Sequence, residues 1–241
     1  MRGLLVELAR PDDNDYEAIA QWVAPAGRVA SFTGDFVTFT TAEDIRTSHR
    51  NGTFRLLVLR RLADGEPIGW VRTDNEGPGC VEVGGGIRED LWEQGYGVDG
   101  AVAVLHYLFR NRNMRRVQVR TAVFNQRMLT LLSWAGFVFE GILRQTKYLD
   151  GEWHDDTIWS MLRNEYRDVF LPKVTAINKR FAPRGQVPSS EYEQARRVLA
   201  EHLRSPGTVS ALATFLDANP APPAEAASPE HNGHRTLARH G

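Results

Sequence analysis

The 241-residue sequence predicts an α/β fold in which one mixed, mostly antiparallel sheet is flanked by helices. Two observations lead to this fold class. Short segments rich in β-branched and aromatic residues, bounded by Gly, Pro or Asp, recur between residues 4 and 87 and between 116 and 162. Apolar residues recur at three- and four-residue spacing after Gly97 and after Asn125, which is typical of amphipathic helices.

The first part of the chain supplies most of the expected strands. We expect a strand over residues 4–8, helices over 14–24 and 41–48, and a meander over 53–62, 67–73 and 80–87. Turns at Asp64-Gly65 and Gly77-Pro78 join the strands of the meander. The triple glycine 84–86 predicts a bulged strand that separates from its neighbour, with close backbone packing as the alternative.

A glycine-rich loop, residues 92–101, lies between the strand 80–87 and the next helix. Glycine has no Cβ to keep an anion from the backbone, and the first turn of a helix carries roughly half a positive charge on its free N–H groups. The loop therefore predicts a pyrophosphate site, and a turn without a ligand is the alternative. No Gly-Lys-Ser/Thr follows, so this is not a P-loop. The residues expected to bind through their backbone N–H groups are Gln94, Gly95, Tyr96, Gly97 and Val98.

The second part of the chain continues the succession of strands and helices. We expect a strand over 116–123, a helix that opens at Asn125 and ends at a Gly136 cap, and a hairpin of 138–148 with 153–162. The hairpin turns at Asp150-Gly151, where glycine tolerates a positive φ.

Composition and charge narrow the class of protein. The chain has 29 basic and 30 acidic residues, a formal charge of −1 and 42% hydrophobic content, so we expect neither a nucleic-acid nor a membrane partner. The sequence contains no 18-residue apolar run and no signal peptide, which predicts a cytoplasmic protein. The single Cys80 cannot form an internal disulfide. Histidines 231, 234 and 240 lack nearby Cys or carboxylate partners, so we expect no metal site.

Three regions are expected along the chain. Residues 1–165 contain the strands and helices described above and form one domain. Residues 166–217 form a helical extension, in which Ser190 and Glu193 provide a capping box, and which packs on the core or against a second copy in a homodimer. Residues 218–241 are rich in Pro and Ala with almost no large apolar residues, so we expect a disordered tail.

Four blocks in this order resemble the GNAT superfamily of acyl-CoA-dependent N-acyltransferases. They are the loop 92–101, the Asn-to-Gly-Phe helix 125–137, the hairpin segments 139–144 and 148–155, and the turn 64–71. The hairpin and the turn are similar to the RimJ/RimL branch, which acetylates ribosomal-protein N-termini. The resemblance covers about residues 4–163. It implies the GNAT fold and an acyltransferase that moves an acetyl group from acetyl-CoA to a primary amine.

The resemblance also implies roles for named residues. The loop would bind the CoA pyrophosphate, Ile87 and Arg88 would bond the pantetheine arm, and Asn125 would bond it from the other side. The family's usual acids and bases are altered here: the branch's serine is Met128, the superfamily's tyrosine is Leu132 and a hairpin glutamate is Lys147. The motif therefore supplies no complete catalytic pair.

Other side chains remain as candidates for the proton transfers. Glu82 occupies the strand position from which many family members supply a general base, although an alternating strand could turn it to solvent. Second candidates are His154 and the two carboxylates after it, Asp155 and Asp156. Tyr148 could protonate the leaving thiolate, with packing in the hairpin as its alternative role.

The acceptor is less defined than the donor. Freeing a lysine ε-amine of its proton at pH 7 costs about 4.6 kcal/mol, against about 1 kcal/mol for an α-amine. A site without a dedicated base therefore favours a peptide N-terminus, an amino acid or a weakly basic small-molecule amine. The aromatic residues expected to border the acceptor are Trp22, Phe32, Phe36 and Phe39.

Two other functions stay open at this point. The altered acid and base positions fit a degenerate module that binds acyl-CoA without catalysis. A related transferase could use another donor, such as a longer acyl-CoA or aminoacyl-tRNA, and an excess of 26 Arg over 3 Lys permits local basic patches for the latter.

Overall fold

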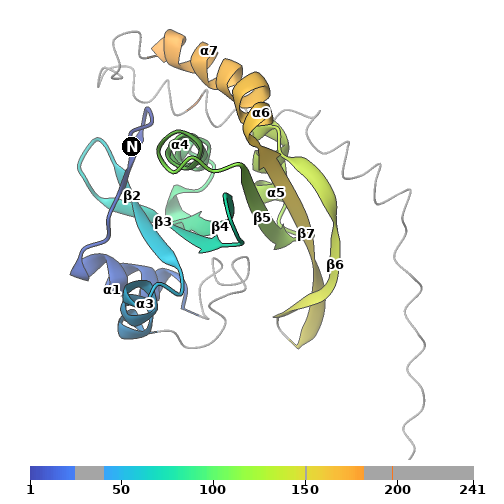
Figure 1. Ribbon diagram of the computed structural model, residues 1–241. Coiled ribbons are helices and arrows are strands. Elements are labelled where there is room, and N and C mark those ends of the chain that lie inside the picture. Colours follow the sequence, from blue (N-terminus) through green and yellow to red (C-terminus); the bar gives the residue numbers. More distant parts are fainter. Residues whose placement is uncertain (25–40, 150, 182–196, 198–241) are drawn as a thin grey trace, which may run out of the picture. The chain divides into compact units, whose positions relative to one another are not determined.

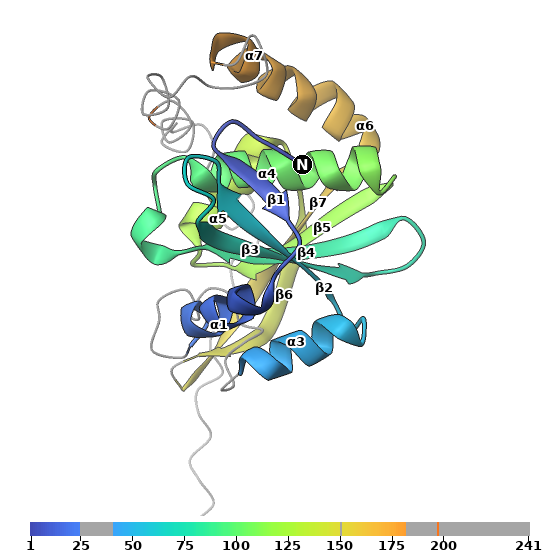
Figure 2. The ribbon, with the colours of Figure 1, turned by 90° about the vertical axis from the view of Figure 1, so that its left-hand side faces the viewer.

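The computed structural model describes residues 1–24, 41–149, 151–181 and 197. Phe32, Phe36 and Phe39, the helix expected after Ser190 and the tail 218–241 lie outside these residues. The described chain forms one sheet covered by helices on both faces, which confirms the expected fold class (Figures 1 and 2).

Seven strands form the sheet in the order β1-β2-β3-β4-β5-β7-β6. Among these described strands, β4 and β5 are the parallel pair and every other neighbouring pair is antiparallel. The strands are β1 (Val6–Ala9), β2 (Arg55–Arg61), β3 (Pro67–Asn75), β4 (Cys80–Ile87), β5 (Arg116–Ala122), β6 (Val138–Leu149) and β7 (Glu152–Leu162). β1 begins later than expected because the N–H groups of Leu4 and Leu5 bond to the Asp99 carboxylate.

Helices α1 (Asp13–Trp22) and α3 (Ala42–Arg50) cover one face of the sheet, as Figure 2 shows. Both begin with a capping box, Asp12 with Asp15 and Thr41 with Asp44, so their first N–H groups have acceptors. Their apolar sides bury a core against β2 and β3. This core comprises Tyr16, Ile19, Val23, Ala42, Ile45, Phe54, Leu56, Val58 and Trp70.

The opposite face carries α4 (Tyr96–His106), which continues into the π-helical segment η2 (Tyr107–Asn111), and α5 (Gln126–Ala135). After β7 the chain forms α6 (Arg163–Glu165), η3 (Tyr166–Phe170) and α7 (Leu171–Phe181). Tyr166 stacks on Phe109 with ring centroids 4.6 Å apart, and the buried Phe170 packs edge-on against Trp134. The described start of the C-terminal extension therefore packs on the core through η2 and α5.

We expect the protein to lose stability as the pH falls below 6.5, the pKa of a free histidine, because His106 is partly buried in its neutral form. Its ring lies 2.8 Å from the Tyr166 hydroxyl, and burial, with a smaller effect of Arg110, lowers its pKa from 6.5 to about 4. The folded state therefore resists protonation, so stability is complete above pH 6.5 and declines as the pH falls toward 4. The loss should reach up to about 3 kcal/mol in urea unfolding followed across this range. His106→Gln should flatten the profile, and an unchanged slope would contradict the assignment.

The parallel strands β4 and β5 separate past Glu82. Their register runs from Cys80 opposite Arg116 to Glu82 opposite Gln118, whereas β4 stays paired with β3 through Ile87. The expected separation is confirmed, but the expected bulge is wrong because the β3–β4 register has no shift. The glycines allow close packing instead. A Cβ on Gly85, which has a φ of +145°, would overlap the Trp70 carbonyl oxygen, and one on Gly86 would come 2.9 Å from the Trp70 ring.

Candidate active site

A cavity of about 640 Å³ fills the space that opens between β4 and β5. Its walls come from the glycines of β4, the first turns of α4, the inner side of β5 and one face of α5. The α5 residues on this wall are Met128, Leu131, Leu132 and Ala135, whose spacing places them on one face of the helix. Met128 and Leu132, the positions where the resemblance implied a serine and a tyrosine, therefore contribute apolar side chains to the cavity.

The N-terminus of α4 forms one end of the cavity. Gly95 is the N-cap residue with a φ of +86°, and the first helical bond runs from Asp99 N–H to the Gly95 carbonyl at 3.1 Å. The N–H groups of Gly97 and Val98 therefore have no acceptor within the helix. Gly97 lines the cavity, and a Cβ there would meet no atom within 4 Å. The Tyr96 and Val98 side chains are buried in the fold, which leaves their backbone as the part that can reach a ligand.

Side chains brace the loop before α4. Trp92 donates from Nε1 to the Ile87 carbonyl at 2.7 Å, and Gln94 donates from its amide to the Asp90 carbonyl at 2.8 Å. Arg127 of α5 reaches across to this loop, where its guanidinium lies 3.0 Å from the Glu93 carboxylate and 4.7 Å from the centre of the Trp92 ring. Arg127 was missed from the sequence, although it stands two residues after Asn125 in the first turn of α5.

The backbone and side-chain groups expected to bond the pantetheine arm differ in whether their hydrogen-bonding atoms already have partners. Past Glu82, β4 has no strand paired on its β5 side among the described residues. Because Gly84 and Gly86 are hydrogen-bonded toward β3, Val83 and Gly85 present their backbone groups on this open side. Asn125 lines the cavity, but its amide already donates to Thr121 Oγ1 at 3.0 Å and accepts from Met128 N–H at 3.3 Å as the cap of α5.

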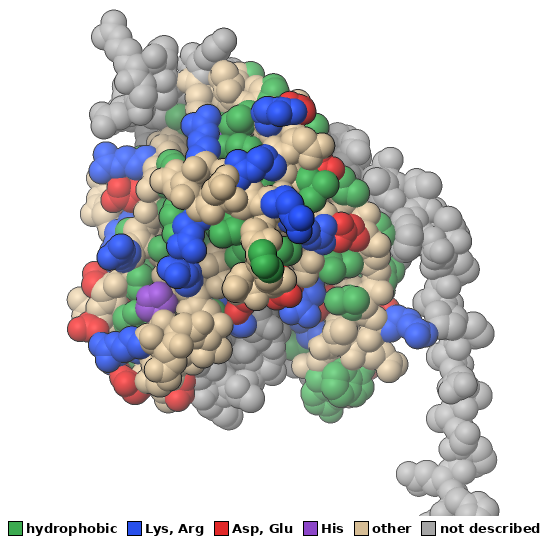
Figure 3. Space-filling model, viewed as in Figure 1, with side chains coloured by type: hydrophobic (Ala, Val, Ile, Leu, Met, Phe, Trp, Pro, Cys, Tyr) green, Lys and Arg blue, Asp and Glu red, His purple; other side chains and the backbone are tan. Residues whose placement is uncertain are grey.

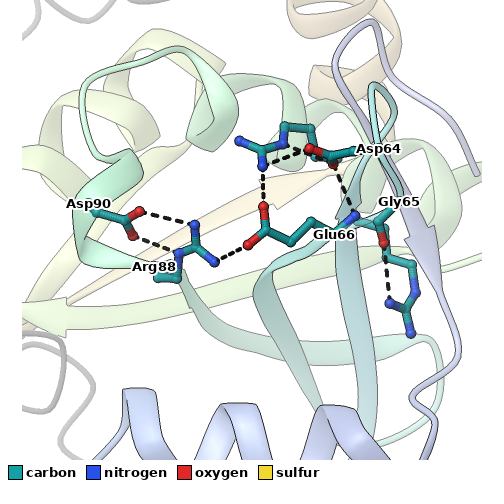
Figure 4. A network of polar contacts seen from close by, with 7 residues as sticks. Asp64, Gly65, Glu66, Arg88 and Asp90 are labelled. Atoms are coloured by element: carbon teal, nitrogen blue, oxygen red, sulfur yellow. Dashed lines mark hydrogen bonds and ion pairs between the residues drawn. The ribbon is translucent and has the colours of Figure 1, made fainter.

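Arg88 does not line the cavity, and its backbone and side chain are engaged in contacts within the fold. Its N–H donates to the Ile68 carbonyl at 2.8 Å, and its guanidinium lies between Glu66 and Asp90, as Figure 4 shows. Asp90, followed by Glu66, raises the pKa of this guanidinium. Ile87 does line the cavity, but its carbonyl accepts the Trp92 indole N–H.

The far end of the cavity is lined by three carboxylates, each with a cationic partner. Asp74 pairs with Arg72 at 2.8 Å, Glu82 with Arg120 at 2.8 Å and Asp156 with Lys147 at 3.4 Å. The Glu82 side chain is 13% exposed and points into the cavity, so it is not a solvated surface residue. Both of its oxygens accept hydrogen bonds from Arg120, and Oε2 also accepts one from Gln118.

Asp156 differs from Glu82 because one of its oxygens is without a hydrogen bond. The side chain is buried, and Oδ1 has no hydrogen-bond donor in the described part of the chain. Of the three consecutive candidates in β7, Asp156 is the one that lines the cavity. Asp155 accepts from Gln145 N–H at 2.8 Å and so fixes the hairpin, and His154 packs edge-on against Phe124 with ring centroids 5.2 Å apart.

Tyr148 and Trp153 line the cavity from the β6–β7 hairpin. Their rings lie 5.2 Å apart and are strongly exposed, at 52% for Tyr148 and 60% for Trp153. One cavity thus brings together the N-terminus of α4, the unpaired edge of β4, three carboxylates and an aromatic pair.

Comparison with known proteins agrees with this geometry. The model of the acetyltransferase (GNAT) domain matches residues 5–138, more than half of the chain. The chain belongs to the GNAT acetyltransferase family. The resemblance found in the four sequence blocks is thereby confirmed.

Individual relatives are distant in sequence. An uncharacterized N-acetyltransferase of Bacillus licheniformis, p20, is 26% identical over 88 residues, which are 36% of this chain and about half, 49%, of that protein. RimJ of Mycobacterium smegmatis in complex with a CoA disulfide matches with a TM-score of 0.61 and 18% identity over 71% of this chain and 88% of that chain. RimL, a ribosomal L7/L12 alpha-N-protein acetyltransferase in complex with coenzyme A, matches with a TM-score of 0.59 and 20% identity over 67% and 96%. At these identities the structures show a common fold.

Two further observations on the described residues concern membrane-spanning helices and metal sites. No helix among residues 1–24, 41–149 and 151–181 is both long and apolar enough to cross a bilayer. In the same part of the chain, no three His, Cys, Asp or Glu side chains are grouped as metal ligands.

Proposed function

We propose that the protein is an N-acetyltransferase that moves an acetyl group from acetyl-CoA directly to a primary amine. The observation that carries this proposal is that one cavity is lined both by Gly97 at the N-terminus of α4 and by the buried carboxylate Asp156, with the unpaired edge of β4 on the same wall. A pyrophosphate, an extended arm and a reacting thioester would each find a suitable environment there.

The donor fits the residues present. The first-turn N–H groups at Gly97 and Val98 would bind the pyrophosphate, and the open space at the Gly97 Cβ position allows it to approach the backbone. Arg127, held at the same loop by Glu93 and Trp92, adds a cation nearby. The arm would lie against the free edge of β4 as an additional strand, and bound acetyl-CoA would supply the thioester.

The amine must be neutral when it attacks, so a group in the cavity has to accept its proton. We infer that Asp156 does this, because its side chain lines the cavity and its Oδ1, which is 3.4 Å from Lys147 Nζ, accepts no hydrogen bond within the described residues. Glu82 remains the second candidate, since its oxygens are engaged by Arg120 and Gln118. Tyr148 is the candidate that would protonate the leaving thiolate, from the wall of the same cavity.

We propose an α-amine as the acceptor, presented at the N-terminus of a peptide. Removing a proton from an α-amine at pH 7 costs about 1 kcal/mol, which one buried carboxylate can offset more readily than the ~4.6 kcal/mol of a lysine. The exposed Tyr148 and Trp153 rings would contact the residues that follow the amine. The name of the RimL neighbour also points to a protein α-amine.

A binding module without catalysis is the second candidate function. Met128 and Leu132 support it, because they place apolar side chains on the cavity wall where the family often has an acid. The two functions make different predictions for thiol release.

The test follows acetyl-CoA binding by thermal stabilisation and thiol release with peptides, amino acids and small amines. We expect acetyl-CoA to stabilise the protein and peptides to release thiol. Asp156→Asn should lower kcat by about 100-fold or more with unchanged acetyl-CoA affinity, and its rate should recover as rising pH frees the amine. Asp155→Asn, the neighbouring carboxylate outside the cavity, is the matched control and should stay active.

Three outcomes would change the proposal. A large loss in Glu82→Gln with full activity in Asp156→Asn would move the base to Glu82. Binding of acetyl-CoA without thiol release from any acceptor would favour the binding module. Absence of acetyl-CoA binding would remove both functions.

A further inference from the structure

A second cavity, of about 950 Å³, adjoins the first and shares Asp74 with it. It is formed where β2 begins, where β3 ends and where the chain leaves η2. Its wall includes His49 and Thr53 before β2, Thr73 and Asn75 of β3, and Tyr107 of η2. None of these residues lines the first cavity.

Three arginines from distant segments line this second cavity: Arg10, Arg55 and Arg112. Within the described residues, none of their guanidinium groups has a hydrogen bond or an ion pair. At the other end of β2, by contrast, Arg60 pairs with Asp12 and Asp15, and Arg61 pairs with Asp64 and Glu66. Arg10, Arg55 and Arg112 thus bring three positive charges to the wall of one cavity.

With the exception of Asp74, the remaining polar side chains of the wall can each donate a hydrogen bond. Thr53, Thr73 and Tyr107 supply hydroxyl groups and Asn75 supplies an amide. His49 accepts the Leu56 N–H at Nδ1, at 3.0 Å, so a neutral ring carries its proton on Nε2. The acidic member of the wall, Asp74, is bound by Arg72 at 2.8 and 2.9 Å.

The surrounding surface has the same sign of charge. Arg112 belongs to the run 110–116, in which four of seven residues are arginine. Figure 3 shows Lys and Arg side chains spread across the face that it draws, with Asp and Glu side chains between them and at the edges. Such a field raises the local concentration of anions near the cavity.

We propose that this second cavity binds a small phosphorylated molecule. Three arginines on the wall of one cavity favour a ligand with more than one negative charge, and a phosphomonoester brings nearly two charges and three acceptor oxygens. Guanidinium groups bind phosphate with two parallel hydrogen bonds, which agrees with arginine at all three positions. A volume of 950 Å³ lies in the range of small-molecule pockets, at its upper end.

Calorimetry at constant ionic strength tests this proposal, with glycerol 3-phosphate as the probe and glycerol as the uncharged control. The protein is saturated with CoA so that the N-terminus of α4 is not free. The same titrations are repeated in Gly97→Trp, in which the indole would block the N-terminus of α4 whether or not CoA is bound. We expect glycerol 3-phosphate, but not glycerol, to bind in both.

Arg55→Gln and Arg112→Gln should each weaken this binding by about tenfold or more, because each removes a charge-assisted pair. Arg144→Gln is the matched control, since this exposed arginine lies on β6 and lines neither cavity. Circular dichroism should show unchanged folding, because neither Arg55 nor Arg112 forms an ion pair in the described chain. Unchanged affinity in both variants, or no binding at millimolar probe, would overturn the proposal. Tighter binding of a short single-stranded RNA through the same arginines would replace the small molecule with a nucleic acid.

Discussion

Replacing Gly97 by Trp is expected to abolish acetyl-CoA binding while the fold stays intact. Gly97 is the second residue of α4 and lines the cavity, and a Cβ there would meet no atom within 4 Å. Its φ lies outside the left-handed region, so an L side chain is accepted without backbone strain. The indole would therefore project into the space proposed for the pyrophosphate. Losing two charge-assisted hydrogen bonds costs about 4 kcal/mol, or roughly a thousandfold in affinity.

Titration calorimetry measures the affinity, and urea unfolding measures the fold. Gly97→Ala is the control of smallest size: it should retain most binding and raise stability by about 0.5–1 kcal/mol through helix propensity. Wild-type affinity in Gly97→Trp would place the donor elsewhere. A loss of folding in Gly97→Trp would mean that the space at this position is not open.

The helix ends that border the proposed donor site could be predicted because they depend on local backbone signals. Gly95, at a φ of +86°, opens α4, Asn125 caps α5, and Gly136, at a φ of +88°, ends it. Each signal acts within a few residues of the chain, so the sequence reveals it without knowledge of the sheet. The bulge expected at residues 84–86 failed for the opposite reason. Gly85 and Gly86 are required by Trp70 on the neighbouring strand, a contact between residues distant in sequence.

Glu82 and Asp156 were both candidates from the sequence, but which of the three consecutive candidates in β7 lines the cavity could not be predicted, because strand pairing decides which side chain enters it. Asp156 lies opposite Leu143, whereas His154 lies opposite Lys147, so β6 carries two extra residues between these pairs. This irregularity determines how the hairpin presents its side chains, and no periodicity in β7 marks it. The same limit explains why Arg127 was missed. Its partners, Glu93 and Trp92, lie more than thirty residues earlier in the chain.

Replacing Asp99 by Ala is expected to remove much of the stability of the domain. The buried carboxylate of Asp99 accepts three backbone N–H groups from the N-terminal segment, from Leu4 at 2.8 Å, Leu5 at 2.7 Å and Val6 at 2.9 Å. Alanine would leave all three donors buried without an acceptor. Each such donor costs about 1–3 kcal/mol, so the loss is about 3–9 kcal/mol against a typical total of about 5–15 kcal/mol. Urea unfolding monitored by tryptophan fluorescence measures it.

Asp99→Asn separates the carboxylate's charge from its shape. The amide keeps one acceptor oxygen but turns an NH₂ group toward N–H donors, so this variant should also lose stability, by less than the alanine variant. Burial raises the pKa of Asp99 above 3.8, while the N–H groups of Leu4, Leu5 and Val6 act in the opposite direction. Because the pKa of Asp99 is higher in the folded state than in the unfolded state, its protonation stabilises the fold below pH 3.8. This contribution is lost as the pH rises through the pKa of the folded state.

The difference in unfolding free energy between the wild type and Asp99→Asn should therefore shrink as the pH rises from 3.8. A difference that grows with pH would mean that the three hydrogen bonds outweigh burial and hold Asp99 as a carboxylate. Glu7→Gln is the matched control, because its carboxylate pairs with Arg2 at the exposed end of the same segment and should contribute little. Asp99 and Gly97 both lie in the first turns of α4, so the two variants test different roles of the same helix end. Asp99 fastens it to the N-terminal segment, and Gly97 keeps its other side open to the donor.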